Sequence, residues 1–216
     1  RGISVLTRGS TGGHGFWVDS QFVSDAANAL KEQNVKSRLG HPTGVEDAIA
    51  YRLGEVAYRE NNDDQLWGDL EFGSFASLSP KGDLKGFVTA LAKDSPSLFG
   101  TSIVFQRDRA AEDAFHREHT DEYGRFNSPD PDNTNSMPHV RLKHLEACDV
   151  VDKPAANPSG LFSDIGELED ALMAFSEDSV SGFLERLLAR RGQSLNSEGD
   201  ESMSDVDKFR HRLPNA

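Results

Sequence analysis

Residues 1–160 contain many short apolar runs, which Gly, Pro, Asn or Asp interrupt at close intervals. Runs of this length, bounded by turn residues, are typical of β-strands. We expect strands at 3–6, 35–39, 51–58, 65–72, 98–106 and 141–152, with a polar turn at 61–64 joining the third and fourth. The first three quarters of the chain are therefore predicted to be rich in β-structure.

Two segments in this region have helical spacing instead. One contains the apolar residues Phe22, Val23, Ala26, Ala27 and Leu30 and follows two possible capping residues, Asp19 and Ser20. The other is 80–94, where Leu84, Phe87, Val88 and Leu91 form one apolar stripe. The polar, turn-rich segment 108–138 is predicted to be a long surface loop.

The character of the chain changes after residue 162. Apolar residues recur at helical spacing (Leu168, Leu172, Phe175, Phe183, Leu184, Leu187 and Leu188), and Ser163 or Asp164 can cap such a helix. From Gln193 onward the chain is rich in Ser, Asp and Glu, a composition typical of disorder. We therefore expect a folded domain at 1–162, a helical appendage at 163–192 and a disordered tail at 193–216.

Composition narrows the functional classes. The chain of 216 residues has a net charge of −13, and the sequence contains no basic cluster of the kind that binds nucleic acid. No apolar run approaches the length of a membrane-spanning helix. A single cysteine, Cys148, excludes an internal disulfide. Because the sequence begins with Arg1 rather than Met, we expect an excised fragment or a processed product.

Three places hold side chains suited to chemistry. His41 follows the strand at 35–39 between Gly40 and a proline. Ser102 lies in the strand at 98–106, where alternation places it on the face opposite Ile103, and Gly100 is expected to leave room beside it for a substrate backbone.

The third place is the strand at 141–152. Alternation places His144, Glu146 and Cys148 on one face and Asp149 on the other. If Leu145 packs in the core, Glu146 faces the side on which a catalytic group is needed.

In this order, the three stretches resemble a known family. They are the Arg-x-Gly-His-Pro end of the strand at 38–42, the Phe-Gly-x-Ser-Ile-Val-Phe run at 99–105, and the long run at 145–162 that includes Pro-Ala-Ala-Asn-Pro. The chain is similar to the prohead proteases of tailed phages, which are related in fold to the herpesvirus maturational proteases. The openings at 2–3 and 13–19 and the Trp-Gly-Asp-Leu at 67–70 also fit, so the resemblance covers residues 2–162.

The resemblance implies an α+β fold, an assemblin-like closed β-barrel flanked by helices, followed by the helical appendage. It implies serine endopeptidase activity with His41 as base, Ser102 as nucleophile and Glu146 as the third member. His144 and Asp149 are the alternatives for that third member. The oxyanion donors are expected in the loop after the third member, at the N–H groups of Ala155 or Ala156.

The resemblance also implies the setting. The expected substrates are the capsid scaffold protein, the major capsid protein and the protease itself, inside an assembling prohead in the host cytoplasm. The tail after Gln193 is the expected site of self-cleavage, because an extended disordered segment can enter an active site easily. A homodimer is possible, and no cofactor, nucleic acid or membrane is expected.

Three other readings remain open. The chain can be a non-catalytic scaffold or capsid-binding module that keeps the fold. A metal site can form from His116, His119 and His139 with Glu118 or Asp121, although the segment lacks a second clear half. Finally, Cys148 and His144 can form a cysteine-nucleophile pair, although lone cysteines are usually buried and inert.

Overall fold

The computed structural model describes residues 2–41, 48–157 and 160–162. The predicted helical appendage at 163–192 and the tail at 193–216 lie outside these residues. The described part contains eight strands and three α-helices: β1 Ile3–Thr7, β2 Gly9–Ser10, β3 Trp17–Val18, α1 Ser20–Glu32, β4 Val35–Arg38, β5 Arg52–Asn61, β6 Gln65–Phe72, α2 Leu84–Asp94, β7 Gly100–Arg107, α3 Arg109–Glu118 and β8 Leu142–Val151. Short 3₁₀ turns occupy Ala48–Tyr51, Ser74–Leu78 and Pro96–Leu98. The predicted α+β class is confirmed.

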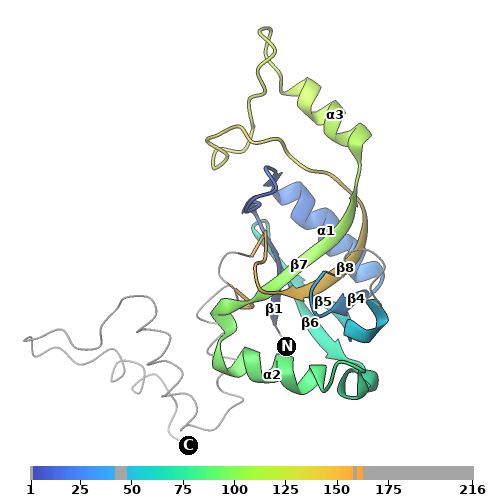
Figure 1. Ribbon diagram of the computed structural model, residues 1–216. Helices are drawn as coiled ribbons and strands as arrows, with labels where there is room; N and C mark the ends of the chain where they lie inside the picture. Colours follow the sequence, from blue (N-terminus) through green and yellow to red (C-terminus); the bar gives the residue numbers. More distant parts are fainter. Residues whose placement is uncertain (1, 42–47, 158–159, 163–216) are drawn as a thin grey trace, which may run out of the picture. The chain divides into compact units, whose positions relative to one another are not determined.

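Six strands form one curled sheet in the order β1-β6-β5-β4-β8-β7, which makes a half-barrel (Figure 1). All neighbours are antiparallel except β4 and β8, which run parallel. This parallel pair places the ends of β4 and β8 at the same edge of the sheet. The residues after β4 therefore lie beside the last residues of β8.

Helix α1 packs against β5, β6 and β8 with the five apolar residues that the sequence singled out, and all five are buried. The Asp19 carboxylate accepts a hydrogen bond from the Phe22 N–H at 3.0 Å and caps the helix. The Phe22 ring meets Phe105 of β7 edge to face, with ring centroids 5.1 Å apart. This contact fixes which face of β7 points into the core.

The edge strands β1 and β7 approach each other without a shared ladder among the described strands. Side chains join them instead. The Thr101 hydroxyl donates to the Ser4 carbonyl, and the buried Asn157 amide donates to the Val5 and Thr101 carbonyls at 3.0 and 2.8 Å. The conspicuous Pro-Ala-Ala-Asn-Pro segment thus contributes the side chain that bridges this gap. The closed barrel stays a prediction.

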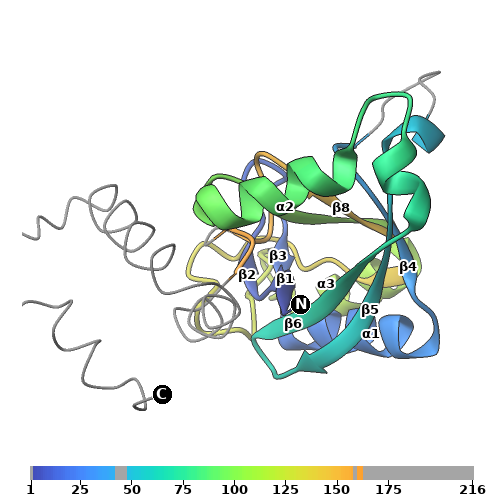
Figure 2. The same cartoon turned by 90° about the horizontal axis from the view of Figure 1, so that it is seen from below.

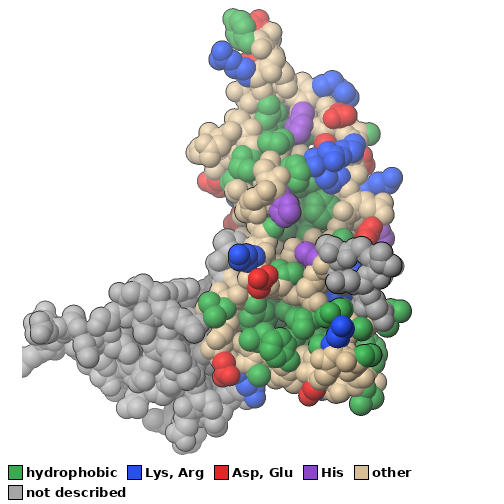
Figure 3. Space-filling model, in the orientation of Figure 1, with side chains coloured by type: hydrophobic (Ala, Val, Ile, Leu, Met, Phe, Trp, Pro, Cys, Tyr) green, Lys and Arg blue, Asp and Glu red, His purple; other side chains and the backbone are tan. Residues whose placement is uncertain are grey.

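Helix α2 lies on a different side of the curled sheet from α1 (Figure 2). The helix was predicted over 80–94 but begins at Leu84, because the Asp83 carboxylate caps it through the Gly86 N–H at 3.0 Å. Exposed apolar side chains gather around α2 in the lower part of Figure 3, namely Phe75, Leu78, Phe87 and Leu98.

The prediction that 108–138 is wholly loop is wrong, because α3 occupies its first third. The helix has few large apolar residues, so its pattern resembles a polar loop. It is held by polar contacts: Asp108 caps it through the Ala111 N–H, and the buried Glu112 carboxylate binds the Arg107 guanidinium with two bonds of 2.7 Å. In the described part of the chain, no helix is long and apolar enough to cross a membrane.

Candidate functional site

The Asp149 carboxylate is the centre of a buried polar cluster near the end of β8. Its side chain is 0% exposed and accepts four hydrogen bonds. The Arg38 guanidinium donates two of them, at 3.0 and 2.5 Å, and the Arg38 backbone N–H donates a third at 3.1 Å. The fourth contact joins Asp149 Oδ2 to His41 Nδ1 at 2.9 Å. A buried carboxylate with this many donors is held in one orientation.

Local backbone geometry places His41 against this carboxylate. Leu39 forms a parallel bridge with Val150, and the Gly40 N–H donates to the Val150 carbonyl at 2.7 Å. Gly40 has a φ of +78°, a conformation that residues with a Cβ rarely adopt. The chain can therefore turn sharply after β4, and the next side chain returns toward β8. The His41 side chain is 39% exposed.

Ser102 approaches the same cluster from the other neighbouring strand. In the β7–β8 ladder it lies directly opposite Asp149, and opposed residues of an antiparallel pair point to the same face. Ile103 and Phe105 pack on the core, so Ser102 projects from the opposite face, as predicted. The Ser102 hydroxyl makes no hydrogen bond to another described residue, His41 included.

A β-bulge explains why Asp149 faces Ser102, against the prediction that it points the other way. Phe105 pairs with Leu145 and Val104 pairs with Ala147, which leaves Glu146 as an extra residue in β8. One extra residue reverses the alternation for everything that follows it. The prediction that β8 alternates regularly is therefore wrong, and so is the prediction that Asp149 points away from the catalytic face.

The other two candidates for the third member lie elsewhere along β8. The Glu146 carboxylate accepts a hydrogen bond from the Gln106 amide at 2.8 Å, an exposed contact at the side of the bulge. His144 is exposed and lies opposite Gln106 in the ladder. The carboxylate that contacts His41 is Asp149, so the structure brings together His41, Ser102 and Asp149 and leaves Glu146 and His144 outside this group.

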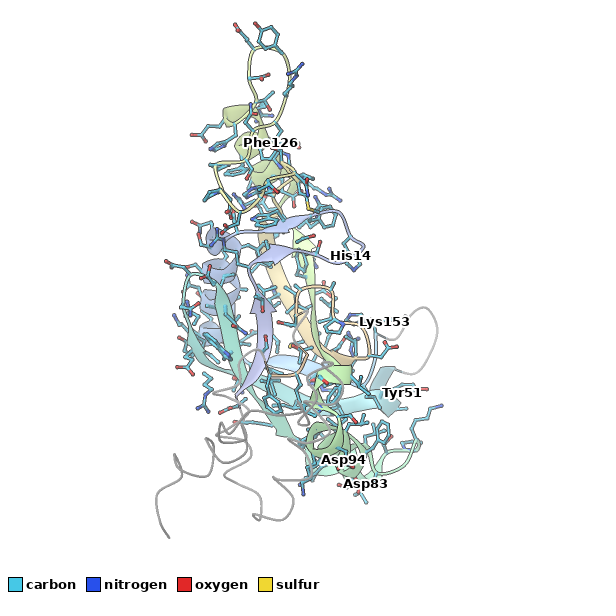
Figure 4. All side chains as sticks on the ribbon, turned by 90° about the vertical axis from the view of Figure 1, so that its left-hand side faces the viewer. His14, Tyr51, Asp83, Asp94, Phe126 and Lys153 are labelled. Carbon is cyan, nitrogen blue, oxygen red and sulfur yellow. The ribbon has the colours of Figure 1, made fainter. Side chains whose placement is uncertain are left out.

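The segment after β8 crosses the sheet beside Ser102. A Cβ on Gly100 would lie 2.9 Å from Pro154 Cγ and 3.2 Å from Gly160, so the space beside Gly100 is filled by the chain itself. The expectation of open space for a substrate there is wrong. The carbonyls of Ala155 and Ala156 accept bonds from the Gly12 and Thr7 N–H groups. Their own N–H groups have no acceptor among the described residues. In Figure 4 the labelled Lys153, in the same segment, points outward from the molecule.

The other candidate chemistries fit the structure poorly. Among the described residues, no group of three or more His, Cys, Asp or Glu side chains is placed to hold a metal ion. His116 Nε2 accepts from the His139 N–H at 3.1 Å, and His119 Nδ1 donates to the Phe115 carbonyl at 2.9 Å, so both are engaged. Asp121 accepts the N–H groups of a turn, and no contact of Glu118 points to a metal. Cys148 is buried, and burial raises the pKa of its thiol to about 12, which leaves little thiolate for catalysis.

Comparison with known proteins finds no match: no family model, curated protein or solved structure is similar to the chain. The interpretation of the site therefore depends on its geometry and on the motif resemblance alone.

Arg38 is the site residue that the sequence reasoning overlooked. It stands in the quoted Arg-x-Gly-His-Pro motif, three positions before His41, and its side chain is mostly buried. A buried arginine at the end of a strand needs a carboxylate partner, and that requirement was the available signal. The partner, Asp149, is 111 positions away, so the pairing itself is invisible to local patterns.

Proposed function

We propose that the chain is a serine endopeptidase in which Ser102 is the nucleophile, His41 the base and Asp149 the residue that orients the base. The observation that carries the proposal is the 2.9 Å contact between His41 Nδ1 and the buried Asp149 carboxylate, with Ser102 opposite Asp149 in the ladder. An imidazole held at Nδ1 by a carboxylate presents Nε2 as a proton acceptor, which is the arrangement that activates a serine hydroxyl.

The chemical steps follow from this arrangement. Ser102 Oγ attacks the peptide carbonyl carbon, and His41 Nε2 takes the hydroxyl proton. His41 then gives this proton to the leaving amine as the C–N bond breaks, and a water molecule releases the acyl group by the same route. The N–H groups of Ala155 and Ala156, which have no acceptor among the described residues and lie in the segment that covers Gly100, are the proposed oxyanion donors.

The absence of a hydrogen bond between Ser102 and His41 in the described structure is compatible with this scheme. Catalytic hydrogen bonds are often long before the substrate binds and shorten in the complex. Rotation about the first side-chain torsion of Ser102 moves the hydroxyl across the strand face without moving the backbone.

The wider setting follows the motif resemblance. We propose that the enzyme matures the proheads of tailed phages and cleaves the scaffold protein, the major capsid protein and itself inside the assembling shell. The side-chain bridge between β1 and β7 supports an assemblin-like barrel that closes at this gap. The exposed apolar side chains around α2 support a homodimer.

A proteolysis assay tests the activity. The full chain is incubated with a broad mixture of peptides, and new termini are identified by mass spectrometry. We expect cleavage by the wild-type protein and its loss in Ser102→Ala and His41→Gln, with unchanged circular dichroism. Undiminished cleavage by Ser102→Ala would refute the assignment of the nucleophile.

A second candidate function is a non-catalytic scaffold or capsid-binding module with the same fold. The missing hydrogen bond between Ser102 and another described residue favours it. A wild-type protein that cleaves no peptide and binds no fluorophosphonate at Ser102 would support this alternative and contradict the proposed protease.

A further inference from the structure

A second hydroxyl, imidazole and carboxylate lie in direct contact at the other end of β8. The Ser128 hydroxyl is 2.7 Å from His139 Nε2, and His139 Nδ1 is 2.6 Å from Asp19 Oδ2. The three residues come from the loop after α3, the segment before β8 and the cap of α1. The β7 residues that pair with Leu142 and Asp149, namely Arg107 and Ser102, are five positions apart, which corresponds to roughly 17 Å at about 3.3 Å per residue.

The contacts of the group fix the direction of its hydrogen bonds. Burial opposes the ionisation of Asp19, but the bonds from His139 and from the Phe22 N–H, together with the charge of Arg141, outweigh it and lower the pKa of Asp19. An ionised Asp19 accepts the proton of His139 Nδ1, so Nε2 of the neutral ring is an acceptor. Of the two acceptors near the Ser128 hydroxyl, Nε2 at 2.7 Å is closer than the Asp130 carbonyl at 3.4 Å, and donation to Nε2 is the polarity that a serine nucleophile requires.

A rigid frame holds the imidazole in place. Its backbone N–H donates to His116 Nε2, and its ring contacts Phe115 with centroids 4.9 Å apart. The Arg141 guanidinium binds Asp19 at 3.0 Å and covers the Phe115 ring at 4.0 Å. The His139 side chain is 1% exposed, so a folded polypeptide segment cannot reach it.

A pocket of about 460 Å³ adjoins this group. Its wall includes His139, Asp19 and the residues that directly follow Ser128, namely Pro129 and Asp130. The volume lies within the range of small-molecule sites. The Asn133 amide nitrogen is 3.3 Å from His139 Nε2 and donates to the Met137 carbonyl at 2.8 Å. The labelled Phe126, two residues before Ser128, lies near the top of Figure 4, far above Lys153.

We infer that Ser128, His139 and Asp19 form a second nucleophilic site, which takes an acyl group from small activated esters and is independent of Ser102. Ser128 Oγ forms a bond to the ester carbonyl carbon, and the bond to the leaving alkoxide breaks. His139 Nε2 receives the hydroxyl proton and passes it to the departing oxygen. Water then attacks the acyl-serine by the same route and releases the acid.

Labelling of the full-length Ser102→Ala protein with a small alkyl fluorophosphonate tests this inference. The serine oxygen displaces fluoride and leaves a stable adduct, which intact mass and peptide mapping locate. We expect one adduct per chain at Ser128, and none after the further change Ser128→Ala. Ser20→Ala is the matched control, because Ser20 lines the same pocket but contacts no histidine in the described structure, and it should leave the labelling rate unchanged.

A third variant tests the relay rather than the nucleophile alone. Asp19→Asn keeps a good helix-capping residue but removes the charge that supports His139, so the labelling rate at Ser128 should fall at least tenfold at a temperature where circular dichroism shows that the variant, destabilised by the loss of the buried Arg141 pair, is still folded. Absence of an adduct at Ser128, or equal labelling in Asp19→Asn, would overturn the inference and leave the three residues as a purely structural link between the loop and α1.

Discussion

Ser102 of β7 lies directly opposite Asp149 of β8, and Arg38 and His41 contact the same carboxylate from the side of β4. Three adjacent strands therefore contribute to one polar row on the outer face of the half-barrel. Each member depends on a different backbone feature: Ser102 on regular alternation, Asp149 on the bulge and His41 on the turn at Gly40. The predictions below separate these contributions.

Asp149→Asn should lower kcat for peptide cleavage by about 10⁴-fold, because an amide favours the wrong imidazole tautomer and cannot support its charged form. Glu146→Gln is the matched control from the same strand and should stay within about twofold of wild type, since its partner is the exposed Gln106 amide. Steady-state kinetics on one peptide measure both. The reverse ranking would assign the third role to Glu146.

Arg38→Met should lower kcat by roughly 10²-fold with little change in KM, because the Asp149 carboxylate loses the two guanidinium hydrogen bonds that fix its orientation. Arg38→Lys should recover only part of the rate, since lysine keeps the charge without the two parallel bonds. Arg52→Met serves as the control: Arg52 pairs with Arg38 across β4 and β5, but its described side-chain contacts are with the Gly54 carbonyl and Glu55. An equal loss in Arg52→Met would indicate general damage to the sheet.

Acid stability should depend on Asp130. Hydrogen bonds from Arg8 lower the pKa of this carboxyl from 3.8 to about 2. A group with a lowered folded-state pKa stabilises the fold above its unfolded value, and this contribution disappears as the pH falls from about 4 to about 2. Asp130→Asn should therefore lower the free energy of unfolding by about 1–3 kcal/mol at pH 7 and flatten its dependence on pH in this window.

Urea titrations at pH 7 and pH 3 measure this effect. Asp132→Asn is the control, because Asp132 binds the same Arg8 guanidinium but its side chain is 70% exposed. It should change the free energy of unfolding by less than about 1 kcal/mol. If the two variants behave alike, the Arg8–Asp130 pair does not have the proposed role.

Cys148 should resist alkylation in the native protein. Its thiol is fully buried and its pKa is raised to about 12, so neither access nor thiolate is available at pH 8. Iodoacetamide should modify it only after unfolding, and the mass increase in urea should follow the loss of circular dichroism. Rapid modification of the folded chain would contradict the described packing of β8.

Much of the fold was predictable because local patterns determine it. The five buried residues of α1 and its Asp19 cap are visible as spacing, and the strands from β4 to β8 lie within a few residues of their predicted positions. Helix α3 was not predictable, because the Arg107–Glu112 ion pair and the Asp108 cap stabilise a segment whose composition resembles that of a loop.

The candidate residues of the site could be singled out from the sequence, but the contacts between them could not. His41 and Ser102 follow from strand ends and alternation, and the sequence left Asp149 open as one alternative. The bulge at Glu146 and the pairing of Arg38 with Asp149 are tertiary features, since they depend on strands that are distant in sequence. For the same reason, Asp19, Ser128 and His139 could not be associated by spacing.

The extra residue at position 146 has a consequence for evolution and for engineering. Between Leu145 and Asp149, four steps of β8 lie opposite three steps of β7. Removal of any one residue between them would restore a regular ladder and keep the Asp149 carboxylate opposite Ser102, whereas a strand that kept all its residues but lost the bulge would turn this carboxylate toward the hydrophobic interior. In chains that share this architecture, we therefore expect versions of this strand that are one residue shorter and lack the bulge to keep the same pairing.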